Sequence, residues 1–112
     1  VCPVNQESGF LDAYNVGHQL YTLRSNVSHT TSVINSKEHE LEGVEDAILH
    51  AEAALIDRET TTEQRIILLA ELKDLSEDTG RLEAEIRDLY EQRAHHQVQL
   101  ENYQATVADY GY

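Results

Sequence analysis

The chain has 112 residues, enough for one domain or one elongated element but too few for a catalytic domain beside a separate binding domain. It carries 21 acidic and 8 basic residues and a formal net charge of −13, so repulsion argues against nucleic acid and anionic membrane as partners. One Phe, six Tyr and no Trp leave few large side chains for a compact core, which favours an extended or oligomeric helical protein.

The N-terminal segment, residues 1–8, has no hydrophobic period and is expected to form an irregular arm. The chain starts with Val1 and contains no Met, which a removed leader or a fragment of a longer chain would explain. We therefore expect an extracellular, extracytoplasmic or virion location. Cys2 has no second cysteine to pair with, so it is either a disulfide between subunits or an unpaired thiol.

The first helical arm is predicted at residues 9–58. From 20 to 55 its apolar residues recur in seven-residue steps, the pattern of a helix with one side packed on another helix. At the start of this arm a second apolar stripe, which includes Phe10, Tyr14 and Tyr21, widens the face. A wide face indicates contact with more than one neighbour.

Residues 25–36 are the ambiguous part of this arm, because Ser, Thr, Asn and β-branched residues are poor helix formers. The heptad nevertheless keeps its phase through Val27 and Ile34, which favours a helix across the segment. The alternative is an interruption followed by a new helix that is capped by Asn35 or Ser36.

A turn is predicted at residues 59–63, where the heptad slips by three residues and the sequence becomes polar. Thr60 and Glu63 have the spacing of a capping box, which marks the start of a new helix. The turn would join two nearly equal arms into an antiparallel hairpin. It contains neither Gly nor Pro, so a continuous oligomeric coiled-coil rod is the alternative.

The second helical arm is predicted at residues 64–109, followed by a tail at 110–112. Its a and d positions alternate in steps of four and three from Leu68 onward. Arg93 and His96 occupy successive a and d positions and form a polar layer, which would fix register and partner number. A second hypothesis is that protonating His96 beside Arg93 loosens the assembly.

The residues expected at the helix–helix interface share the a and d positions of the two arms. They are Leu20, Leu23, Val27, Ile34, Leu41, Val44, Ile48, Leu55, Leu68, Leu72, Leu75, Leu82, Ile86, Leu89, Leu100, Tyr103 and Val107. Polar residues at the same positions, Thr30, Lys37 and Thr79, indicate an interface selected for specificity more than for maximal stability.

No catalytic, cofactor-binding or metal site is predicted. The pairs Asp46/His50 and Glu91/His95 have the spacing at which two helical side chains share an ion, but two ligands do not complete a zinc site. The sequence contains no phosphate-binding Gly-rich loop, CxxC, GxSxG or HExxH motif. It also contains no apolar run long enough to span a bilayer.

The sequence thus predicts an all-α protein with long heptad-patterned helices, arranged as an antiparallel hairpin or coiled-coil bundle. The general pattern of the chain resembles the coiled-coil parts of viral tail and fibre proteins, whose seams tolerate Ser, Thr and Asn. We expect a non-enzymatic structural or assembly protein of a virion, appendage or surface filament that self-associates or binds partner subunits, without a small-molecule substrate. The alternative is a secreted or periplasmic helical binding protein, chaperone-like or metal-responsive.

Overall fold

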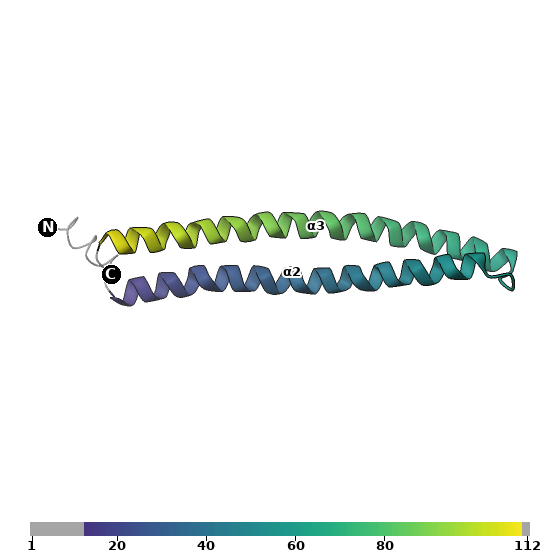
Figure 1. Cartoon of the computed structure of the whole chain (residues 1–112), viewed down its shortest axis with the longest axis horizontal. Coiled ribbons are helices and arrows are strands. Elements are labelled where there is room, and N and C mark those ends of the chain that lie inside the picture. The colour runs from purple at the N-terminus through teal and green to yellow at the C-terminus, as the bar shows by residue number, and fades with distance from the viewer. Residues whose placement is uncertain (1–12, 111–112) are drawn as a thin grey trace. The chain divides into compact units, whose positions relative to one another are not determined.

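The computed structural model describes residues 13–110 and contains two helices, α2 (Ala13–Ile56) and α3 (Thr62–Asp109), which Figure 1 labels. All regular secondary structure in this described range is helical, so the predicted all-α class is confirmed. Residues 25–36 are helical throughout. The chain divides into two compact units: unit 1 combines Val1–Ser32 with Tyr90–Tyr112, and unit 2 is Val33–Leu89.

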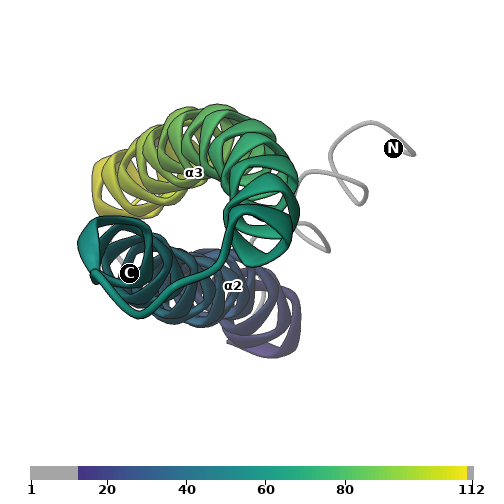
Figure 2. The same cartoon turned by 90° about the vertical axis from the view of Figure 1, so that its right-hand side faces the viewer.

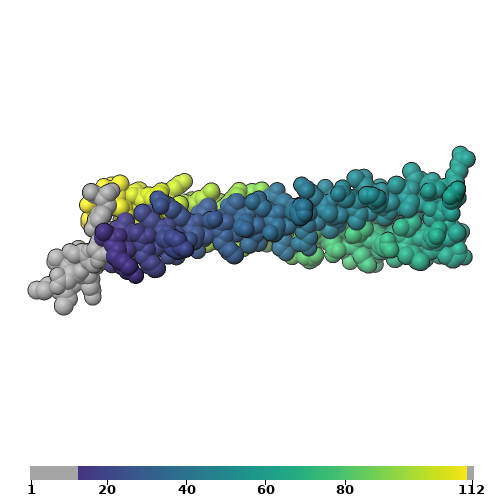
Figure 3. All heavy atoms as spheres, turned by 90° about the horizontal axis from the view of Figure 1, so that it is seen from below, coloured from purple at the N-terminus to yellow at the C-terminus, as the bar shows by residue number. Residues whose placement is uncertain are grey.

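Unit 2 is an antiparallel helical hairpin. The end of α2 and the start of α3 are joined by the short connection 57–61, which is seen end-on in Figure 2. The space-filling view shows the α2 and α3 segments of this unit in contact along the visible face (Figure 3). The predicted hairpin is therefore confirmed and the chain is not one continuous helical rod, because the helix stops at Ile56 and its successor runs back beside it.

The last carbonyls of α2 are satisfied by side chains that follow it. Thr60 Oγ1 donates to the Ala54 carbonyl oxygen at 2.6 Å, and Arg65 donates through Nε to the Leu55 carbonyl oxygen at 3.2 Å and through Nη2 to the Asp57 carbonyl oxygen at 3.0 Å. Carbonyls at a helix C-terminus have no partner inside the helix, so such donors stabilise the stop. This explains a sharp reversal without Gly or Pro.

The start of α3 is closed by a capping box at Thr61 and Gln64. The Gln64 amide donates to Thr61 Oγ1 at 3.2 Å, and the Thr61 amide donates to Gln64 Oε1 at 2.9 Å. The prediction of a box at Thr60 and Glu63 is therefore wrong by one residue. Its physical reason is that the Thr60 hydroxyl is used by the carbonyl of Ala54, at the end of the preceding helix.

The core of unit 2 is narrow. Ile34 is 1% exposed and Leu82 is 0% exposed, and Ala51 is the other buried apolar residue there. Unit 1 pairs residues 13–32 of α2 with residues 90–109 of α3, and its buried residues are Val16, Val107 and Thr30. Two helices enclose only a thin strip of each other's surface, so most apolar positions are covered on one side.

Candidate functional site

The apolar residues expected at the interface are buried or half-buried in the structure. Ile34, Leu82 and Val107 are buried. Half-buried are Leu20, Leu23, Val27, Leu41, Val44, Ile48, Leu55, Leu68, Leu72, Leu75, Ile86, Leu89, Leu100 and Tyr103. The hairpin thus shields its a and d residues incompletely, and additional helices would be needed to cover them.

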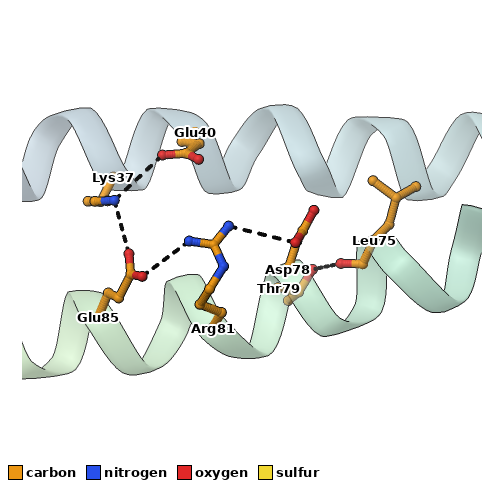
Figure 4. Close-up of polar contacts among 7 residues, drawn as sticks. All are labelled: Lys37, Glu40, Leu75, Asp78, Thr79, Arg81 and Glu85. Carbon is orange, nitrogen blue, oxygen red and sulfur yellow. Dashed lines mark hydrogen bonds and ion pairs between the residues drawn. The ribbon is translucent and has the colours of Figure 1, made fainter.

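The polar layer of unit 2 is a small ionic network. Lys37 on α2 places Nζ 3.0 Å from Glu85 Oε2 on α3 and 4.0 Å from Glu40 Oε2 (Figure 4). Arg81 Nη1 donates to Glu85 Oε1 at 3.1 Å, and Arg81 Nη2 lies 3.6 Å from Asp78 Oδ1. Lys37, which the heptad places in the seam, is therefore paired with a carboxylate on the opposite helix of the hairpin.

This network shifts the pKa values of its members in opposite directions. Contact with the Lys37 ammonium, followed by the hydrogen bond from Arg81, holds the pKa of the Glu85 carboxyl below its ordinary value. The hydrogen bond to Glu85 is the main cause that raises the pKa of the Arg81 guanidinium. Both groups remain charged at neutral pH, so the layer is ionic under ordinary conditions.

Two of the polar seam residues are satisfied within their own helices. Thr30 Oγ1 donates to the Asn26 carbonyl oxygen at 2.8 Å, and Thr79 Oγ1 donates to the Leu75 carbonyl oxygen at 3.0 Å. Such back-bonding lets a threonine lie in an interface without an unpaired hydroxyl. These two residues therefore require no partner across the hairpin.

The polar layer of unit 1 has a different chemistry. Arg93 and His96 are half-buried. Arg93 Nη1 donates to Thr31 Oγ1 at 3.4 Å, and the Arg93 guanidinium carbon lies 4.8 Å from the centre of the Tyr90 ring. The Nδ1 atom of His96 is buried without a hydrogen-bond partner. A hydroxyl and an aromatic ring thus contact the cation.

One flank of unit 2 exposes large apolar side chains. These are Leu49, Ile56, Ile66 and Leu69, with exposed fractions from 59% to 84%. In the heptad all four occupy b or e positions, which lie to the same side of the a/d seam in an antiparallel pair. We call this set the b/e flank. Contiguous exposed apolar surface on helices is typical of an interaction surface.

The other flank of unit 2 contains an open groove. Ala47, Ala51 and Ala54 leave space on the α2 side, and Leu68 of α3 lines both parts of the groove. The larger part has a volume of about 500 Å³ and the smaller part about 340 Å³. Because Ala47, Ala54 and most of the α3 lining occupy g or c positions, we call this feature the g/c groove.

The histidine pairs do not assemble into a metal site. His50 Nδ1 lies 2.8 Å from the backbone carbonyl oxygen of Asp46. Within residues 13–110 no group of three or more His, Cys, Asp or Glu side chains is arranged to hold a metal ion, and this range includes Glu91 and His95. Neither described helix contains an apolar stretch long enough to cross a membrane.

The wide face predicted near the N-terminus is described only in part. Tyr14 is 79% exposed and stacks on His18, with ring centres 6.1 Å apart, and Tyr21 is 71% exposed. Phe10 and Cys2 lie outside the described residues. Sequence reasoning missed both the g/c groove and the role of Arg65 in the turn; the alanine spacing of four and three was the available signal for the groove.

No family model, curated protein or solved structure matches the chain.

Proposed function

We propose that the chain is a non-enzymatic structural protein that assembles by packing the b/e flank of its hairpin on the same flank of another copy. Such a subunit would build a virion, an appendage or a surface filament from repeated helix–helix contacts. A two-helix hairpin has little core of its own, and additional copies would cover the apolar surface that each hairpin leaves in water.

The exposure of the b/e flank is the observation that carries this proposal. Ile56 is 84% exposed, Leu49 and Ile66 are 64% exposed, and Leu69 is 59% exposed. Each large aliphatic side chain that becomes fully buried contributes about 1.5–3 kcal/mol. A symmetric contact buries the set twice, once from each copy, so a few residues are enough to hold two hairpins together.

The charges beside the b/e flank also favour contact between copies. Glu52 on α2 and Lys73 on α3 occupy e and b positions among the apolar residues, so both signs are present. A surface with both signs can offer each charge a counterpart on an identical surface, whereas a surface of one sign repels its copy. The overall charge of −13 makes copies repel each other, and a local balance of charge at the contact reduces that repulsion.

The test is the mass of the protein in solution across a range of concentrations. One chain has a mass of 12.7 kDa, and light scattering should give two or more chains at high concentration. The double variant Leu49→Gln, Leu69→Gln keeps good helix formers but removes apolar contacts from both copies. Its association should weaken by at least about a hundredfold, because two leucines are lost from each copy and a loss of only about 3 kcal/mol already gives that factor.

The matched control is Ala53→Gln, Ala70→Gln, which adds the same side chains at exposed f positions away from both flanks. It should leave the mass unchanged, and circular dichroism should show equal helix content in all three proteins. A single-chain mass at every concentration, or equal weakening by the two double variants, would contradict the proposal.

A further inference from the structure

The g/c groove of unit 2 has the shape that receives apolar side chains. Its floor alternates small and large residues: Ala47, Ala51 and Ala54 on α2, with Leu68 and Leu75 on α3. The alanines recur at spacings of four and three, so they form one continuous row on the helix. Large side chains of an additional helix would fill the space that this row leaves open.

The polar side chains around the larger part of this floor offer hydrogen-bond acceptors. Glu71 and Asp74 line the larger part of the groove, and both are exposed. His50 also lines it, and its Nδ1 must donate to the Asp46 carbonyl oxygen because a carbonyl only accepts. The neutral ring then keeps Nε2 as an acceptor. A partner with many donors is complementary to this set.

No cation lines either part of the groove. Arg65, which comes three residues before Leu68, directs its guanidinium to the carbonyls of Leu55 and Asp57 and so belongs to the turn. A second copy of the chain would bring further acidic residues against Glu71 and Asp74, which is unfavourable. The charge therefore distinguishes the groove from the b/e flank.

We propose that the g/c groove docks a cationic amphipathic helix, with apolar side chains of that helix over the alanine row and its Lys or Arg residues beside Glu71 and Asp74. This interaction uses a different surface from self-assembly and would let one hairpin contact a copy and a basic partner segment at the same time. Apolar anchors give such a contact its affinity, and the rim charges give it orientation and selectivity.

The probe is a fluorescently labelled amphipathic peptide of about 14 residues, built from leucine and lysine with the leucines on one helical face. A peptide with glutamate in place of lysine is its counterpart. Fluorescence anisotropy with the full chain should show saturable binding of the lysine peptide and no binding of the glutamate peptide. Equal binding of both peptides, or of neither, would overturn the proposal.

Charge-neutralising variants separate the groove from the general acidity of the chain. Glu71→Gln with Asp74→Asn should weaken peptide binding about tenfold, which corresponds to two rim ion pairs. Asp46→Asn with Glu77→Gln removes the same charges at exposed f positions and should change binding less than about twofold. Equal effects of the two pairs would show attraction to the whole acidic chain and contradict docking in the groove.

A second pair of variants tests the apolar floor. Ala54→Leu fills the smaller part of the groove and should weaken peptide binding severalfold, whereas Ala53→Leu on the exposed f position next to it should not. Light scattering of the same samples should show that neither Ala54→Leu nor Ala53→Leu changes the self-assembled mass. A wild-type chain that does not self-assemble would contradict the proposed function. A wild-type chain that self-assembles but binds the lysine and glutamate peptides equally would contradict only docking in the groove.

Discussion

The polar layers of unit 2 and unit 1 place cations in the helix–helix interface by different means. In unit 2 the ammonium of Lys37 meets the carboxylate of Glu85, which also binds Arg81. In unit 1 the guanidinium of Arg93 contacts a hydroxyl and an aromatic ring, beside a His96 whose Nδ1 has no hydrogen-bond partner. The first layer depends on an ionised acid, whereas the second depends on the contacts of a guanidinium with a hydroxyl and an aromatic ring.

The burial of apolar residues adds to this contrast. Unit 2 contains Ile34 and Leu82, which are almost completely enclosed, whereas the apolar residues buried in the described part of unit 1 are the smaller Val16 and Val107. The comparison indicates that packing stability is concentrated in unit 2. In unit 1 the threonine Thr30 is also among the buried residues, so less of the buried surface there is apolar.

The largest expected effect is on the core. Leu82→Ala should lower the free energy of unfolding by about 3 kcal/mol, because it removes a fully buried side chain and leaves a cavity. Val107→Ala in unit 1 removes fewer methyl groups and should cost about 2 kcal/mol. Urea unfolding followed by circular dichroism measures both, and a larger loss for Val107→Ala would reverse the comparison.

The second prediction concerns acid. Because the folded-state pKa of Glu85 is below its ordinary value of 4.5, its contribution is present above that pH and is lost as the pH falls through the folded-state pKa. Urea midpoints at about pH 6 and about pH 3 should therefore differ more for the wild-type chain than for Glu85→Gln. Glu83→Gln, at an exposed site on the same helix, should behave like the wild type.

The smallest effect is expected in the layer of unit 1. Arg93→Gln removes the hydrogen bond to Thr31 Oγ1 and the contact with the Tyr90 ring, and it should lower the free energy of unfolding by about 0.5–1 kcal/mol. Arg87→Gln, at an exposed position of the same helix, should leave the urea midpoint unchanged. Equal urea midpoints for Arg93→Gln and Arg87→Gln would contradict a stabilising role of this layer.

The hairpin was predictable because the heptad changes phase at a polar segment, and the structure reverses there between Ile56 and Thr62. The hydrogen bonds of the turn were not predictable, because either of two neighbouring threonines could cap the second helix. Thr60 and Thr61 both have side-chain hydroxyls, and only the position of the last α2 carbonyls decides that Thr60 closes one helix and Thr61 opens the next.

The contacts across the hairpin were less accessible to sequence reasoning than the periodicity. Lys37 has many acidic residues available on the second arm, and the choice of Glu85 depends on the register that the connection imposes. The g/c groove was missed for a related reason. Because alanine has the highest helix propensity, a row of alanines can be explained without a groove, and the groove becomes evident only when the facing residues are known to be Leu68 and Leu75.

Arg65 links the two helices at the reversal through side-chain hydrogen bonds, in addition to the short backbone connection. Its guanidinium bonds to the carbonyls of Leu55 and Asp57 and so joins the two helices by a route that bypasses the backbone between Arg58 and Glu59. If that peptide bond were cut, the two pieces would still carry the groups that align their ends. The hydrogen bonds of Arg65 hold the two helix ends together without the backbone of the connection. The covalent link mainly keeps the two helices at a high effective concentration relative to each other.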